Sequence, residues 1–80
     1  MTDDEVKVKL TEIFRDVFDD ESLEITPETT AADIRDWDSV NQIMILMASE
    51  VAFNIKFGTA ETEGLRNVGE LISVIRQKVG

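Results

Sequence analysis

The chain has 80 residues, of which 42% are hydrophobic and one is proline, so we expect one small folded domain spanning residues 1–80. Eight basic and seventeen acidic side chains give a net charge of −9, which disfavours binding to nucleic acid or anionic membranes and favours partners with basic patches. Histidine and cysteine are absent, which excludes Ser-His-Asp and Cys-His catalysis, disulfide bonds and zinc sites built on those residues.

The first predicted element is an amphipathic helix near the amino terminus. Thr2 and Glu5 have the spacing of a capping box, and the helix should end near Phe18, where a run of acidic residues breaks the pattern. Its apolar residues recur at helical spacing: Val6, Leu10, Ile13, Phe14 and Val17. The first residues are acidic rather than basic, and no apolar run is long enough to span a membrane, so we expect a cytoplasmic protein.

A long connection, residues 19–38, follows the first helix. Pro27 argues against a continuous helix across it, and ordered loops of this length tend to be functional. We expect four apolar residues to hold the loop against the core: Leu23, Ile25, Ile34 and Trp37. The acidic start of the loop does not fit an EF-hand, because Glu24 or Ile25 stands where a calcium loop needs glycine, so no metal site is predicted.

The second helix is predicted to run from Ser39 to Phe53 and is apolar on two sides. One stripe comprises Val40, Ile43, Met47 and, at its edge, Met44, and the other comprises Ile45, Leu46 and Phe53. Such a helix is either enclosed at the centre of a bundle or exposes one stripe to a partner. Because the other helices of so small a bundle cannot easily wrap it, we favour a docking surface over a fully enclosed helix.

Ser39 stands at the start of this helix and has two interpretations. Serine is a preferred N-cap residue, and Gln42 three positions later completes the pattern of a capping box. On local pattern alone Ser39 is a helix cap, and Asp38 beside it suits the positive end of the helix dipole. The other interpretation is an attachment point for a prosthetic group, and it depends on the wider sequence.

Two more helices are predicted in the last third of the chain. Thr59 would cap a short helical turn over residues 60–63 that ends at Gly64. The last helix begins at Asn67, where Glu70 completes a capping box. Its apolar positions are Val68, Leu71, Ile72, Ile75 and Val79. No segment alternates with a period of two, so we predict an all-α fold: a small four-helix bundle of three long helices and one short helix, with a long loop between helices one and two.

The sequence around Ser39 resembles the prosthetic-group site of acyl carrier proteins. The resemblance lies in Trp37-Asp38-Ser39, in Val40 after it, and in the apolar helix that follows. It extends over the whole chain, including Phe53-Asn54-Ile55-Lys56-Phe57 and Asn67-Val68-Gly69-Glu70-Leu71. The Trp-Asp-Ser spelling is especially similar to that of discrete carriers of specialised pathways, such as D-alanyl carrier proteins.

The resemblance implies that Ser39 carries a 4′-phosphopantetheine arm taken from coenzyme A, and that Asp38 assists recognition by the phosphopantetheinyl transferase. The arm would supply the thiol that the chain itself lacks. The protein would then be a monomeric acyl or aminoacyl carrier, not an enzyme. Its further partners would be a loading ligase or synthase and acyl-transferring enzymes of a specialised pathway, with no role for nucleic acid or membranes.

The same resemblance assigns the two sides of the second helix. Partner enzymes would contact Val40, Ile43 and Met47, and a tethered acyl chain would lie against the inward face of Ile45, Leu46 and Phe53. Two residues depart from the carriers of housekeeping fatty-acid synthesis: Met44 replaces a usually acidic residue, and Ser49 replaces a bulky apolar one. The alternative function is an unmodified adaptor with the carrier fold that binds a partner through Val40, Ile43, Met44 and Met47.

Overall fold

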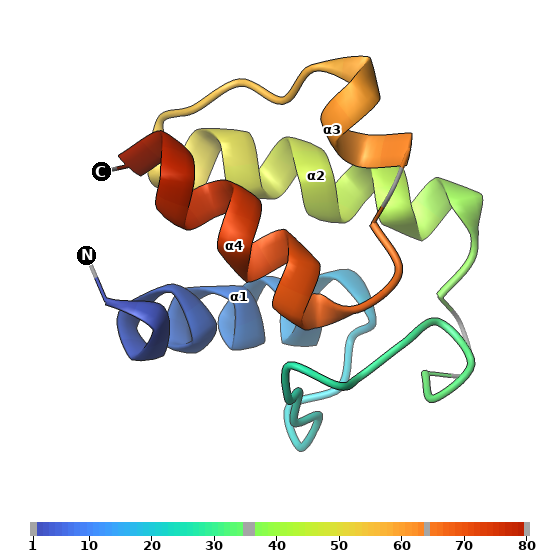
Figure 1. The fold of residues 1–80 in the computed structure, drawn as a ribbon. Helices are drawn as coiled ribbons and strands as arrows, with labels where there is room; N and C mark the ends of the chain where they lie inside the picture. The colour runs from blue at the N-terminus through green and yellow to red at the C-terminus, as the bar shows by residue number, and fades with distance from the viewer. Residues whose placement is uncertain (1, 35–36, 64, 80) are drawn as a thin grey trace.

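The computed structural model describes residues 2–34, 37–63 and 65–79. Within these residues the chain forms four helices and no strand: α1 (Asp3–Val17), α2 (Ser39–Phe53), α3 (Thr59–Glu63) and α4 (Val68–Val79). α1 packs against both α2 and α4, and the long loop between α1 and α2 lies at one end of the bundle (Figure 1). This arrangement confirms the predicted fold class. None of the helices in the described part is long and apolar enough to cross a membrane.

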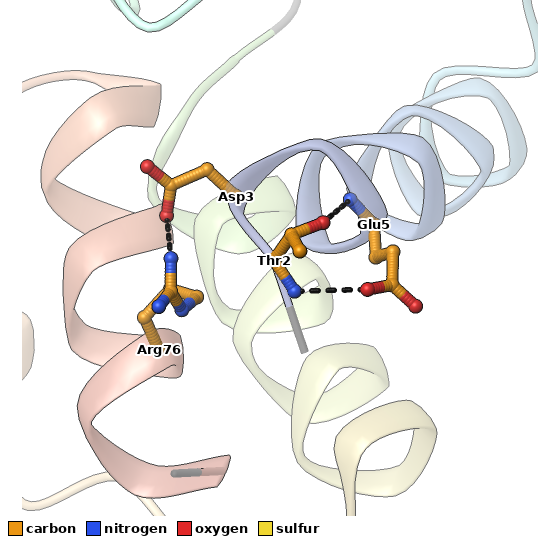
Figure 2. A network of polar contacts seen from close by, with 4 residues as sticks. All are labelled: Thr2, Asp3, Glu5 and Arg76. Carbon is orange, nitrogen blue, oxygen red and sulfur yellow. Dashed lines mark hydrogen bonds and ion pairs between the residues drawn. The ribbon is translucent and has the colours of Figure 1, made fainter.

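α1 begins at the capping box that the sequence predicts. The Glu5 amide donates to the Thr2 hydroxyl oxygen at 3.2 Å, and the Thr2 amide donates to the Glu5 carboxylate at 3.0 Å (Figure 2). The bonds from the Thr2 amide and hydroxyl lower the pKa of Glu5, because they stabilise its ionised form. At the same end of the bundle Arg76 of α4 forms an ion pair with Asp3, which joins the two helices (Figure 2).

The core is formed by one face of each long helix together with the long loop. Its buried apolar residues are Val6, Leu10, Ile13, Phe14, Ile25, Ile34, Ile45, Phe53, Val68, Leu71, Ile72 and Ile75. The loop residues Ile25 and Ile34 are buried, and Leu23 and Trp37 are partly buried against the core, as predicted. The apolar faces of α1 and α4 predicted from helical spacing are also confirmed, with Val17 and Val79 only partly buried.

The loop is also bonded to the beginning of α4. The Gly69 amide donates to the Pro27 carbonyl at 2.8 Å, and the Val68 amide donates to the Thr29 carbonyl at 2.9 Å. A Cβ atom at Gly69 would lie 3.0 Å from the Pro27 carbonyl oxygen, so glycine permits this close approach of the loop to the helix. These bonds hold the middle of the loop against the start of α4.

α4 begins at Val68 and is capped by Asn67. The Asn67 side-chain oxygen accepts a hydrogen bond from the Glu70 amide at 2.8 Å, whereas the Glu70 carboxylate accepts from the Arg66 amide at 2.7 Å. Of the two reciprocal bonds in the predicted capping box, therefore, only the one that the Asn67 side chain accepts from the Glu70 amide is present. The Glu70 carboxylate instead accepts from the amide of Arg66, the residue before the cap.

The short α3 is tied to α4 by an ion pair. Lys78 Nζ lies 2.8 Å from a carboxylate oxygen of Glu61, which also accepts a hydrogen bond from the Gly58 amide at 2.7 Å. The bond from Lys78 and then that from Gly58 lower the pKa of Glu61. α3 begins at Thr59 itself, one residue earlier than predicted, and the predicted end at Gly64 lies outside the described residues.

Candidate functional site

The amino terminus of α2 places Asp38 and Ser39 side by side in different roles. Asp38 has an extended backbone, and its carboxylate accepts a hydrogen bond from the Asn41 amide at 2.9 Å. Asp38 is therefore the N-cap, and Ser39 is the first helical residue. The prediction that Ser39 caps the helix in a box with Gln42 is wrong. The cap lies one residue earlier, and the Gln42 side chain accepts a hydrogen bond from Trp37 instead.

The hydroxyl of Ser39 is accessible and uncommitted. Ser39 is exposed, and its hydroxyl has no hydrogen-bond partner within the part of the chain that the structure describes. The other serines differ. Ser22 donates to a neighbouring carboxylate at 2.7 Å, Ser49 is fully buried, and Ser73 is exposed but lies within α4 rather than at a helix start. Among the serines, all of which lie in the described part of the chain, only Ser39 combines an exposed hydroxyl, a helix start and a preceding aspartate.

Trp37 fixes the segment that leads into α2. Its indole N–H donates to the Gln42 side-chain oxygen at 2.5 Å, and its ring meets that of Phe14 edge-on, with centroids 5.2 Å apart and planes at 89°. Phe14 is fully buried on α1, so the partly buried tryptophan connects this segment to the core. The predicted role of Trp37 as an anchor of the loop is confirmed.

The inward face of α2 is the one that the sequence predicts. Ile45 and Phe53 are buried, and Leu46 is partly buried against the core. Ser49, also on this face, donates its hydroxyl to the Ile45 carbonyl at 2.7 Å. A polar side chain is therefore accommodated in the core, because its donor is satisfied within its own helix.

The outward face of α2 carries an exposed apolar stripe, called the α2 stripe below: Val40, Ile43, Met44, Met47 and Val51. Their exposed fractions range from 47% at Met44 to 84% at Val51. A fully enclosed second helix is therefore excluded. Val51 is absent from the predicted set, although its position four residues after Met47 continues the same face.

Charge is scarce along α2 although the chain as a whole is strongly acidic. Glu50 is the only acidic residue in the helix, and its carboxylate accepts a hydrogen bond from the Phe57 amide at 2.8 Å. The carboxylate therefore helps to order the chain after α2. Among the described residues, no group of three or more histidine, cysteine, aspartate or glutamate side chains is placed to hold a metal ion.

Proteins similar in sequence are acyl carrier proteins, although no protein-family model matches the chain. The meromycolate extension acyl carrier protein of Mycolicibacterium smegmatis is 32% identical over 76 residues, a match that covers 95% of this chain and 77% of that protein. The protein of the same name from Mycobacterium tuberculosis is 31% identical over 77 residues, which cover 96% of this chain and 67% of that protein.

A solved structure is similar in fold as well as in sequence. The solution NMR structure of a holo acyl carrier protein from Geobacter metallireducens matches with a TM-score of 0.87 and 42% identity, covering 92% of this chain and 85% of that one. Members of this family hold acyl groups as thioesters on a covalent 4′-phosphopantetheine arm, and the exposed serine at the start of α2 fits such an arm. The chain belongs to the acyl carrier proteins, and it is a carrier of acyl groups rather than an enzyme.

Proposed function

We propose that the 4′-phosphopantetheine arm is joined through a phosphodiester to the hydroxyl of Ser39, and that the protein carries acyl or aminoacyl groups in a specialised pathway. The observation that carries this proposal is the exposed, uncommitted hydroxyl at the first residue of α2. Because Asp38 caps the helix, substitution on the Ser39 oxygen leaves the bond from Asp38 to the Asn41 amide intact. The protein can therefore accept the arm without losing the start of its second helix.

The position also suits the charge of a phosphodiester. The first amides of a helix point outward without intrahelical partners, and the aligned peptide dipoles give this end a partial positive charge. An anion attached at the first helical residue is stabilised by both effects. The arm supplies a terminal thiol for thioester formation, which the chain cannot supply because it has no cysteine.

Asp38 is proposed to bind the phosphopantetheinyl transferase in addition to capping α2. Its side chain is exposed beside the reacting hydroxyl, so its carboxylate is accessible to a basic group on the transferase while one oxygen accepts from the Asn41 amide. Charge complementarity of this kind accelerates encounter and fixes orientation. The net charge of −9 would add a longer-range attraction to any basic partner.

The α2 stripe is proposed to dock the enzymes that load and unload the arm, through Val40, Ile43, Met44 and Met47. The occupant should present an apolar surface to the stripe and a basic group near the Asp38 end. This polarity follows from the charges on the helix: Asp38 is exposed at its start, whereas Glu50 near its end is bonded to the Phe57 amide. An unmodified adaptor would use the same stripe, but it would have no need for an uncommitted serine beside it, so this alternative is not favoured.

Modification is tested by incubating the protein, expressed without its arm, with coenzyme A and a broad-specificity transferase, followed by intact mass measurement. One phosphopantetheine should be added to the wild type and none to Ser39→Ala. Ser73→Ala is the matched control, since it removes another exposed hydroxyl, and it should be modified like the wild type. A mass increase that persists in Ser39→Ala would place the arm elsewhere, and no increase in the wild type would favour the adaptor.

A further inference from the structure

Two side-chain hydrogen bonds join residues on either side of Ser39 in the sequence. The Trp37 indole N–H donates to the Gln42 side chain, and the Asn41 amide donates to the Asp38 carboxylate, so both bonds span Ser39. The Trp37 amide in turn donates to the carbonyl of the buried Ile34 at 3.2 Å. Residues that precede the serine are therefore hydrogen-bonded to residues that follow it, while the serine itself is exposed.

This cross-link also fixes the site relative to the bundle. The Trp37 ring lies edge-on against Phe14, which is fully buried on α1, and Gln42 belongs to α2. The bond between Trp37 and Gln42 therefore joins the segment preceding Ser39 to two helices that already pack together. A substitution that removes it should leave the core residues in place and take away one of the contacts that fix the segment carrying Asp38.

We propose that Gln42 is a positioning residue for the modification of Ser39, and that it acts by holding Trp37. The inference rests on the proposed attachment at Ser39. A transferase must bind the serine and the aspartate before it in one arrangement, and a segment that is already ordered loses less conformational freedom when it binds. Loss of the Gln42 acceptor should therefore weaken binding of the carrier to the transferase, without altering the chemical step on the bound complex.

Single substitutions can remove either partner of the bond between Trp37 and Gln42. Gln42→Leu removes the acceptor and keeps a side chain of similar size, whereas Trp37→Phe removes the donor and keeps an aromatic ring against Phe14. Gln77→Leu is the matched control, because Gln77 is an exposed glutamine on α4. The double variant Trp37→Phe with Gln42→Leu completes a double-mutant cycle. Because the two substitutions remove the two partners of one hydrogen bond, their effects on modification should not be additive.

The first measurement is the steady-state rate of transfer from coenzyme A as a function of carrier concentration, at a temperature where every variant is fully folded by circular dichroism. In Gln42→Leu the KM for the carrier should rise about two- to tenfold, the range expected for the net contribution of one hydrogen bond, with kcat nearly unchanged. Trp37→Phe should raise the KM by a similar factor. The KM of the double variant should be no higher than that of the single variant with the larger KM, and the KM of Gln77→Leu should equal that of the wild type.

The second measurement uses the single tryptophan of the chain, whose indole N–H gives one unambiguous NMR signal. This signal should shift upfield and exchange faster with solvent in Gln42→Leu, and it should be unchanged in Gln77→Leu. An unchanged signal in Gln42→Leu, a KM equal to that of Gln77→Leu, or additive effects in the cycle would each overturn the inference. Failure of the wild type to be modified would instead overturn the proposed function, so the two failures are distinguishable.

Discussion

Replacing Asp38 should destabilise the protein more than replacing Ser39, although both residues have the chemistry of a helix cap. Asp38→Ala removes the oxygen that accepts from the Asn41 amide at 2.9 Å, and loss of such a cap costs about 0.5–2 kcal/mol. For a domain of this size that corresponds to a fall of about 2–16 °C in Tm, at roughly 4–8 °C per kcal/mol. Ser39→Ala removes a hydroxyl without a partner in the described structure and improves helix propensity by up to about 0.5 kcal/mol, so its stability should be nearly unchanged.

The assay is thermal and urea unfolding followed by circular dichroism at neutral pH, on protein without its arm. Asp38→Asn is the informative control, because asparagine caps helices about as well as aspartate but carries no charge. It should recover the stability lost in Asp38→Ala and still be modified more slowly than the wild type if the carboxylate binds the transferase. A larger loss of stability in Ser39→Ala than in Asp38→Ala would refute this description of the cap.

Three further results are expected. Trp37→Ala should lower the free energy of unfolding by about 2–4 kcal/mol in urea titrations, somewhat less than for a fully buried aromatic ring, because Trp37 is partly buried; normal stability with lost modification would instead make it a recognition residue. Met44→Gln should leave Tm nearly unchanged and weaken transfer to the cognate enzyme with little salt dependence; stronger binding by Met44→Glu, or unfolding of Met44→Gln, would contradict the docking role. Lys78 and the Gly58 amide lower the pKa of Glu61 in the folded protein below its ordinary value of 4.5. The ionised Glu61 carboxylate therefore stabilises the fold above pH 4.5, and this stabilisation is lost as the pH falls through the lowered pKa. Glu61→Gln should therefore be less stable than the wild type near neutral pH, and the difference should shrink as the pH falls below 4.5; a difference that stays constant down to full protonation of the carboxylates would contradict this.

The sequence predicted the helices well because their signals are local. The bounds of α2, the capping box of α1 and the apolar faces of α1 and α4 depend on spacing within one element, and all of these are confirmed. The cap of α2 was ambiguous for the same reason. Aspartate and serine are both preferred N-cap residues, and Asp38 and Ser39 are adjacent, so local pattern cannot choose between them.

What decides the cap is a contact between elements. Gln42 accepts from the Trp37 indole N–H, and Trp37 is positioned by Phe14 of α1, more than twenty residues away in the sequence. A glutamine bonded in this way is not available to complete a capping box. The half-formed box at Asn67 has a local origin instead, since the Glu70 carboxylate accepts from the Arg66 amide rather than from the amide of the cap itself.

The α2 stripe is the feature that folding alone explains least. A small domain has few core positions, yet α2 places Ile45 and Phe53 inside and leaves five large apolar side chains outside. Exposed apolar residues at isolated positions need no explanation, but these occupy successive turns of one helix face that begins beside the exposed Ser39. Polar residues there would be expected to preserve the fold and improve solubility, which supports the proposal that the stripe makes contacts outside the chain. Its place beside the proposed attachment site means that an enzyme docked on it would have the tethered group within reach of its own active site.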